Sequence, residues 1–302
     1  MAGSETAYRI NPDRPFTAEL QATARGQIDG ALESLAATGG DPDSAIHDLR
    51  KRTKKLRALL RLARDGMAGR YGAENRALRD TARLFSRVRD ARVLSDTLQW
   101  LADMDGDATL DPLVDWAARR HGDIMAQADL PEATAEAAAR LRALRQRLPD
   151  WTVTGSDRAA IRSGVKRTYG RARKAWLKAE TRPDDAARLH ELRKRLKYHR
   201  YHCELLAETR PETMKARVET LHELTGALGD DHDLSVLLDT LGREAPHDLP
   251  RSALRRTEQL ARESSAALRN RAFALAPRVL VEKKGALADR LAGTWPAVAI
   301  GA

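Results

Sequence analysis

Two segments of the chain carry cationic side chains at a spacing that places them on one face of a helix. At about 100° per residue, each set forms a narrow stripe beside the apolar face of its helix. Guanidinium groups bind phosphate oxygens in bidentate fashion, and lysine acts as a mobile point charge. The chemistry expected of both stripes is therefore the binding of a row of phosphates. The stripes comprise His47, Arg50, Lys54, Arg57 and Arg61, and His190, Arg193, Lys197 and Arg200.

These cations have few of the acidic neighbours that a solvated helix surface normally carries. Like charges four residues apart on a helix repel one another, whereas Glu and Lys at this spacing attract. An external polyanion would neutralise the stripes, and the release of its counterions would add affinity at low salt. The alternative is that the arginine stems merely cover apolar surface and hold their charged groups in water.

Further basic flanks are predicted on neighbouring helices. Cations share a face in residues 73–103, and others flank an apolar face in residues 156–180. Several such flanks meeting where helices pack would form a positive groove or pore. The candidate anion-binding residues outside the two stripes are Lys51, Arg76, Arg79, Arg83, Arg162, Lys166, Arg173 and Lys194.

The histidines that open the stripes have two possible roles. His47 and His190 could each donate a hydrogen bond to phosphate and gain charge below neutral pH. Alternatively, each could cap a helix or bond to an acid, for which Asp90 and Asp233 are the candidates. We expect these two aspartates to orient a neighbouring histidine or arginine rather than to touch an anion.

The elements that must position these residues are all expected to be helices. Hydrophobic residues make up 42% of the chain and aromatics only 4%, and no segment has the pattern of a strand. Glycine and proline fall between the periodic segments, where helices should start or stop. The predicted helices are 15–38, 43–65, 73–103, 109–128, 132–148, 156–180, 184–208, 211–243, 250–275 and 278–293.

The apolar faces of the two striped helices predict which residues point inward. In 43–65 these are Ile46, Leu49, Thr53, Leu56, Leu60 and Ala63, and in 184–208 they are Leu189, Leu192, Leu196, Cys203 and Leu206. The only cysteine, Cys203, is thus expected to be a small core residue. His199 takes the position that Leu56 has in the other helix, which indicates a packed core histidine.

An internal repeat relates the two striped helices. The segment from Ile46 to Arg52 recurs from Leu189 to Arg195, at an offset of 143 residues, and 16 of the 53 positions in 46–98 match their partners without a gap. The chain is therefore predicted to be all-α, with two pseudo-symmetric helical bundles of about four to five helices each. We assign residues 1–14 to a flexible N-terminus, 15–149 to the first repeat and 156–293 to the second.

The distribution of charge supports an anionic partner. The 302 residues carry a formal net charge of +10, whereas residues 46–92 alone carry +10 and residues 158–200 carry +11. Such blocks attract nucleic acid, anionic lipid or polyphosphate. No apolar run reaches the roughly 20 residues that span a bilayer, and no signal peptide is visible, so we expect a cytoplasmic protein without membrane contact.

The histidine-led stripes resemble the CHAD family, the conserved histidine α-helical domain. The resemblance rests on the two stripes together with the dipeptides Arg89-Asp90 and His232-Asp233, and it covers about residues 15 to 293. It implies two pseudo-symmetric helical bundles that bind inorganic polyphosphate in a basic surface or pore, with sulfate or phosphate ions as mimics. It also implies association with polyphosphate granules. CHAD domains often follow a CYTH-type triphosphatase domain, which nothing in this sequence resembles, so no catalytic residue is carried over.

Two other functions are compatible with parts of the sequence. A metal-binding protein or phosphohydrolase would have to use His199, His202 and the segment 230–233, but neither half repeats a ligand set of the kind that zinc or calcium needs. A nucleic-acid binder is allowed by the charge, but stacking aromatics are scarce, so only non-specific binding is expected. We therefore expect neither a cofactor nor a metal, and the sequence identifies no protein partner.

Overall fold

The computed structural model describes residues 8–37, 41–67, 69–293 and 295. Within these ranges the chain forms eleven α-helices and four short 3-10 turns and contains no strand. The fold is therefore all-α, as predicted. The helices are α1 (Phe16–Ala36), α2 (Pro42–Ala63), α3 (Arg70–Arg83), α4 (Ser86–Asp105), α5 (Asp111–Gln127), α6 (Leu130–Gln146), α7 (Asp157–Glu180), α8 (Ala186–Leu205), α9 (Pro211–Glu244), α10 (Arg251–Leu280) and α11 (Lys284–Ala292).

Local capping fixes where the helices that matter most begin. The side chain of Asp41 accepts hydrogen bonds from the backbone of Asp43 and Ser44 at the start of α2. Asp185 does the same for Arg188 at the start of α8. These bonds satisfy amide groups that a helix N-terminus leaves without partners. Each cap lies five or six residues before the histidine that opens a stripe. The start of the helix therefore determines where along the helix the stripe begins.

Two predicted helices differ from the observed ones. The segment 73–103 forms two helices, because the buried Phe85 leaves helical geometry, with φ −109° and ψ 16°. In the other case α10 runs through Pro277 to Leu280, where the sequence predicted a break. Proline removes one hydrogen bond from a helix, but Val279 and Leu280 are buried, so packing stabilises the last turn.

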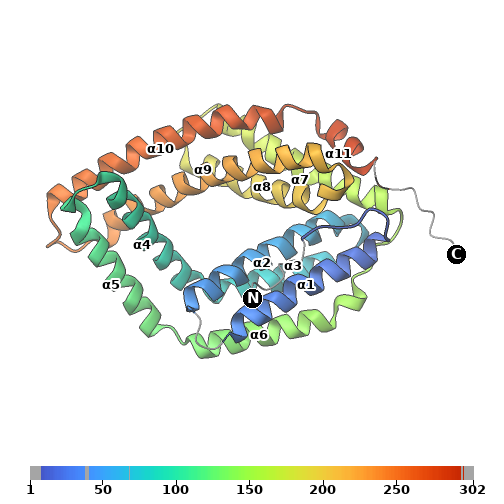
Figure 1. Cartoon of the computed structure of the whole chain (residues 1–302), viewed down its shortest axis with the longest axis horizontal. Coiled ribbons are helices and arrows are strands. Elements are labelled where there is room, and N and C mark those ends of the chain that lie inside the picture. Colours follow the sequence, from blue (N-terminus) through green and yellow to red (C-terminus); the bar gives the residue numbers. More distant parts are fainter. Residues whose placement is uncertain (1–7, 38–40, 68, 294, 296–302) are drawn as a thin grey trace.

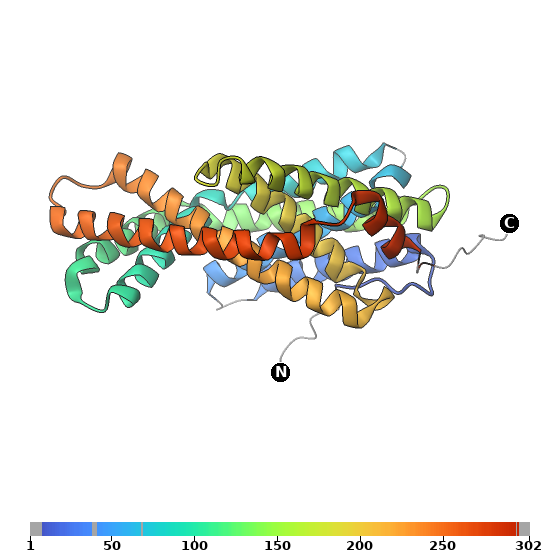
Figure 2. The same cartoon turned by 90° about the horizontal axis from the view of Figure 1, so that it is seen from above.

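The helices enclose the centre of an elongated molecule. Figure 1 shows α7 to α11 along one side, α1 to α3 and α6 along the other, and α4 with α5 closing one end. The long helices α9 and α10 pack against each other, and α8 packs against α7 and α9. Seen from above in Figure 2, the long α10 crosses most of the molecule. No described helix is long and apolar enough to cross a membrane.

The hydrophobic interior consists of two clusters that both halves of the chain share. The larger cluster joins α1 and α2 to α7, α8 and α11, with Leu56 and Ile161 among its fully buried members. The smaller one joins α4 and α5 to α9 and α10, through residues such as Leu98 and Leu237. Six α-helices precede residue 149 and five follow residue 156, among those described, compared with the four to five expected for each half. The extra helix in the first half arises from the break at Phe85.

The segment before α1 is held against the core from residue 8 onward. Tyr8 and Ile10 are buried, the Tyr8 hydroxyl donates to the carbonyl of Lys55 at 2.7 Å, and the Ile10 amide donates to Leu205 at 3.0 Å. Residues 1–7 lie outside the described residues. The flexible N-terminus that the sequence predicted for residues 1–14 therefore does not extend over residues 8–10.

The predicted interior residues of both striped helices are buried. All six inward positions of α2 and all five predicted for residues 184–208 have little or no exposed area. Cys203 and His199 are fully buried, which confirms their assignment to the core. Arg217 of α9 donates a hydrogen bond to Nε2 of His199 at 3.0 Å, so this buried ring nitrogen has a partner. With the apolar faces buried in this way, the basic flanks of α2 and α8 must emerge beside the core.

Candidate functional site

The basic flanks of α2 and α8 emerge into one recess, which we call the central recess. It has a volume of about 750 Å³ and lies between α2, α4, α8 and α9. Its wall consists of His47, Arg50, Lys51, Lys54, Lys55, Arg89, Asp90, Val93, His190, Arg193, Lys194, Lys197, Arg200, Tyr201, Glu204, His222, His232, Asp233 and Val236.

The wall of the central recess is strongly cationic. It contains nine lysine and arginine side chains and three carboxylates. Opposed helices that present like charges to the same space repel one another, and low-dielectric walls strengthen the resulting potential. An anion added to the recess would therefore relieve repulsion among these cations.

Residues related by the predicted repeat line the same recess. Nine of the seventeen candidate binding residues line the recess: His47, Arg50, Lys51, Lys54, His190, Arg193, Lys194, Lys197 and Arg200. Four pairs among them are related by the offset of 143 residues: His47 with His190, Arg50 with Arg193, Lys51 with Lys194, and Lys54 with Lys197. Asp90 with Asp233 and Val93 with Val236 line the wall as further pairs at the same offset.

The arginines of the recess differ in the groups that hold them. One Arg50 nitrogen donates to the carbonyl of Ala82 at 2.9 Å and lies 3.2 Å from the hydroxyl of Ser86. Arg193 lies 3.8 Å from Asp233, and its Nε is buried without a hydrogen-bond partner among the described residues. Arg200 pairs with Glu204 at 3.1 Å on the same helix. Internal carboxylates thus neutralise only part of the charge.

Two lysines in the recess have strongly shifted proton affinities. Burial, together with the nearby Arg50 and Arg193, lowers the pKa of Lys54 to about 8. Burial, Arg193 and Lys54 lower the pKa of Lys197 to about 7. Part of the Lys54 side chain is exposed to water, but protein atoms surround the rest of it and reduce its hydration. These shifts arise because an ammonium group among other cations is costly to charge.

Three histidines of the recess, His47, His190 and His232, are neutral in the free protein near pH 7. Burial is the main cause that lowers the pKa of His190 to about 4 and the pKa of His232 to about 4, and their rings lie 4.1 Å apart between centroids. Burial and Arg89 also lower the pKa of His47. Neutral imidazole still offers one N–H donor to an anion.

The two aspartates at equivalent positions of the predicted repeat, Asp90 and Asp233, lie among the cations. Burial raises the pKa of both Asp90 and Asp233, while the neighbouring Arg50 and Arg193 act in the opposite direction. In the described structure neither carboxylate forms an ion pair with His47 or His190, and Asp233 instead lies beside Arg193. This arrangement agrees with a role in orienting arginine rather than histidine.

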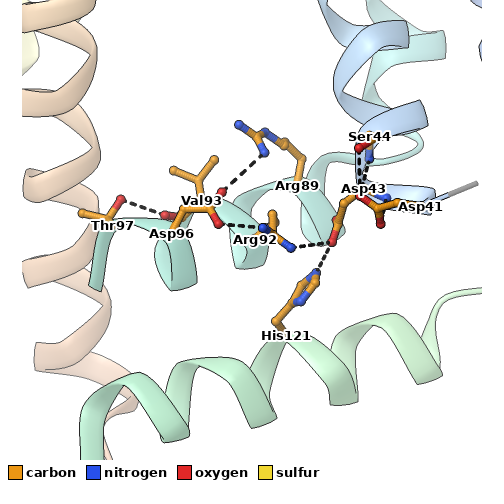
Figure 3. Close-up of polar contacts among 9 residues, drawn as sticks. All are labelled: Asp41, Asp43, Ser44, Arg89, Arg92, Val93, Asp96, Thr97 and His121. Atoms are coloured by element: carbon orange, nitrogen blue, oxygen red, sulfur yellow. Dashed lines mark hydrogen bonds and ion pairs between the residues drawn. The ribbon is translucent and has the colours of Figure 1, made fainter. Parts of the chain in front are cut away.

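The end of the recess at α4 is tied to the start of α2. Figure 3 shows Asp43 between two helices, 3.4 Å from Arg92 of α4 and 3.3 Å from His121 of α5. Arg92 also donates to Asp96 at 2.7 Å, and Arg89 lies 4.0 Å from the same carboxylate. These contacts hold the first turn of α2 against α4, which places His47 and Arg50 opposite Arg89.

An adjoining pocket of about 260 Å³ has the opposite charge balance. It shares Arg89, Val93 and Asp233 with the central recess and adds Asp96, Thr97, Trp100 and Asp230. Burial raises the pKa of Asp230, and Asp233 contributes to the rise. The positive potential is thus concentrated toward α2 and α8 and decreases toward this pocket.

The other eight candidate residues do not line the central recess. Arg57 and Arg61 both donate to Asn75, and Arg61 also stacks over Tyr198 at 3.9 Å. The cations of α3 do not border the recess, whereas Arg89 of α4, which follows the break at Phe85, does. The residues outside the recess are Arg57, Arg61, Arg76, Arg79, Arg83, Arg162, Lys166 and Arg173.

Several of these residues have partners of their own. Arg79 and Arg83 both pair with Asp80, at 2.9 and 3.6 Å. Arg162 pairs with Asp289 of α11. Lys166 lines a separate groove on α7. The spacing of cations along a helix therefore predicted their shared face but not the neighbour that each would meet.

Sequence reasoning missed other residues of the recess wall. Arg89 and His232 belong to dipeptides that were noted in the sequence but were not predicted to bind. Lys55 is largely buried, and its ammonium lies 5.0 Å from the Tyr8 ring centre. His222 comes from α9, where no pattern in the sequence marks it. Among the described residues, no group of three or more His, Cys, Asp or Glu is arranged to hold a metal ion.

The part of the chain that forms this site matches a known protein family. A family model described as the CHAD domain matches residues 22–242, which include every residue lining the central recess. The chain belongs to the CHAD family. This chain resembles the crystal structure of the CHAD domain from the plant Ricinus communis, with a TM-score of 0.60 and 20% sequence identity over 97% of this chain and 96% of that one. At this identity the likeness shows a shared fold. The search of curated proteins found no match for this CHAD chain.

Proposed function

We propose that this CHAD protein binds inorganic polyphosphate in the central recess and does not act on it chemically. The observation that carries the proposal is the convergence of nine lysine and arginine side chains, against three carboxylates, on one space between four helices. Polyphosphate offers a negative charge at every repeat unit and no other recognition feature. Guanidinium groups and mobile ammonium groups suit such a ligand.

The composition of the wall favours polyphosphate over nucleic acid. Single-stranded nucleic acid usually stacks its bases on aromatic side chains. Apart from the histidines, Tyr201 is the one aromatic ring among the recess-lining residues, and it is 5% exposed. A phosphate chain needs no stacking surface, and its charges would lie over α2 and α8, away from the acidic pocket. Sulfate and phosphate ions are expected to occupy the same positions as mimics.

The proposed role is that of a binding module. The recess holds no described cluster of carboxylates and histidines that would assemble divalent cations around a phosphoanhydride. In the cell, we expect the protein in the cytoplasm and on polyphosphate granules, where its ligand is concentrated. Release of phosphate from polyphosphate by the purified protein would contradict this part of the proposal.

Charge reversal provides a direct test. Arg193→Glu should weaken binding of a polyphosphate of defined length by about tenfold or more, because a hydrogen bond to a charged group contributes roughly 1.5–3 kcal/mol. The matched control is Arg119→Glu on α5, an exposed residue that does not line the recess. Affinity measured by calorimetry should also fall linearly with the logarithm of salt concentration.

Competition and folding controls complete the experiment. Polyphosphate should displace single-stranded DNA with the same number of phosphates at physiological salt, and the reverse should fail. Thermal melting checks that Arg193→Glu remains folded, and Arg193→Gln removes the charge without adding repulsion. Equal affinities for the Arg193→Glu and Arg119→Glu proteins would overturn the proposal.

A further inference from the structure

A second basic groove lies on the outside of the molecule, and we call it the outer groove. It has a volume of about 440 Å³ and is formed by α7 and the first residue of α11. Five of its seven lining residues are cationic and none is acidic. The lining residues are Ser163, Lys166, Arg167, Gly170, Arg171, Lys174 and Lys284.

Most of these cations have no internal partner. Arg167 donates to Asp65, and Ser163 bonds to the same carboxylate. Arg171, Lys174 and Lys284, in contrast, form no hydrogen bond or ion pair with any side chain that the structure describes. Arg162, the residue directly before Ser163, pairs instead with Asp289. The outer groove therefore brings together three cations from two helices that have no carboxylate partner in the described structure.

A close approach between the two helices shapes the groove. Gly170 lies where a side chain would meet Lys284, since a Cβ atom there would be 3.1 Å from Lys284 Cδ. The absence of a side chain lets Lys284 lie over α7, so cations from two helices border the same shallow space. Like charges brought together without a carboxylate repel one another, and a bound anion removes that cost.

The outer groove is separate from the central recess. Neither α7 nor α11 contributes a residue to the recess wall. α7 packs against α8, whose other side lines the recess, so at least the width of a helix, about 10 Å, separates the two sites. In Figure 1, α7 and α11 lie together toward one end of the molecule. A short anion can therefore occupy one site but cannot fill both.

We propose that the outer groove is a second phosphate-binding site, through which one long polyphosphate chain links several copies of this protein. The proposal rests on the proposed function, since the same chain is held in the central recess of one molecule and in the outer groove of another. Two sites on each protein and many on each polymer make a multivalent system. A second contact on a tethered polymer forms at high effective concentration, so weak sites suffice.

The test separates binding from linking. The double variant Arg171→Glu/Lys174→Glu removes two exposed cations of the outer groove. The matched control, Arg119→Glu/Arg255→Glu, changes the charge equally at exposed positions on α5 and α10. Each protein is titrated with tripolyphosphate by calorimetry and with long-chain polyphosphate in sedimentation velocity runs at physiological salt.

The expected result is a difference in assembly alone. The wild-type and control proteins should form species heavier than one protein with the long chain, whereas the outer-groove variant should lose most of these species. All three should bind tripolyphosphate at the central recess with affinities within about twofold of one another. Assembly by the outer-groove variant at wild-type levels would overturn the inference, as would equal loss in the control, which would indicate a net-charge effect.

Two further outcomes distinguish the inference from the proposed function. If the wild-type protein fails to bind tripolyphosphate and long-chain polyphosphate alike, the proposed function itself fails. If it binds both but never assembles, only the second site is refuted. Single-stranded DNA or anionic vesicles that require the outer groove, when polyphosphate does not, would overturn the assignment of phosphate chains as its occupant.

Discussion

The most informative residues are two lysines that approach each other from α2 and α8. Lys54 and Lys197 are related by the offset of 143 residues, and Lys54 contributes to the lowering of the Lys197 pKa. Burial lowers the pKa of Lys197 to about 7, so a large fraction of this side chain is neutral in the free protein at physiological pH. A polyanion in the recess would favour the charged form and raise this pKa again.

Binding should therefore take up protons. Polyphosphate affinity is expected to fall as pH rises from 7 to about 9, because the free protein loses protons from Lys197 and then Lys54, whose pKa is about 8, while the bound form retains them. Calorimetry in buffers of different ionisation enthalpy measures the uptake. Lys197→Arg should reduce it near pH 7.5 and keep most of the affinity.

The control for proton uptake is Lys178→Arg, at an exposed lysine of α7 that does not line the recess. This variant should show the wild-type number of protons. If Lys197→Arg takes up as many protons as wild type, Lys197 is not a source of the coupling. Uptake that is equally reduced in both variants would point to lysines in general rather than to the recess.

At the scale of elements, the recess depends on how closely α2 and α7 pack. Gly164 of α7 faces the backbone of α2, and a Cβ atom there would collide with the carbonyl of Leu62. Leu62 and the neighbouring Ala63 are fully buried, so α2 has little room to move away. The position of the basic stripe on α2 is thus set partly by the absence of a side chain on another helix.

Gly164→Ala should destabilise the protein by about 1–3 kcal/mol, the usual cost of overpacking a core. Unfolding in denaturant measures the change. The matched control is Gly226→Ala in α9, where a Cβ atom meets nothing within 4 Å and the gain in helix propensity should stabilise by about 0.5–1 kcal/mol. Equal stabilities of the two variants would show that α2 and α7 have more freedom than the structure indicates.

At the scale of the whole molecule, the two halves of the chain depend on each other. Both hydrophobic clusters take residues from before residue 149 and after residue 156. The central recess likewise uses α2 and α4 from one half and α8 and α9 from the other. The predicted repeat thus describes the chain sequence, while the cores and the site belong to the two halves together.

Cutting the chain after Gly155, in an exposed loop, should show this dependence. The fragments 1–155 and 156–302 are expected to lack cooperative unfolding when purified separately, because each exposes apolar surface that the other covers. Mixed or produced together, they should recover helical structure and polyphosphate binding, as circular dichroism and calorimetry would measure. Cooperative folding and full-strength binding by one fragment alone would contradict the expectation.

The sequence by itself determined the features that depend on neighbouring residues. Helical periodicity and the buried faces of α2 and α8 were predictable, because they involve residues within a few turns of one another. The same local logic failed at Phe85, whose burial against distant residues breaks a continuous helical pattern. The assignment of His199 to the core succeeded because its repeat partner is apolar.

Only the tertiary structure decided which basic flanks meet. Lys54 and Lys197 face one recess, whereas Lys166, with similar spacing and charge, borders the outer groove, and Arg57 is held by Asn75. Helix periodicity fixes the direction of a side chain relative to its own axis, but the crossing of helices far apart in the sequence sets what lies opposite. That crossing follows from the packing of the shared cores, which no single segment contains.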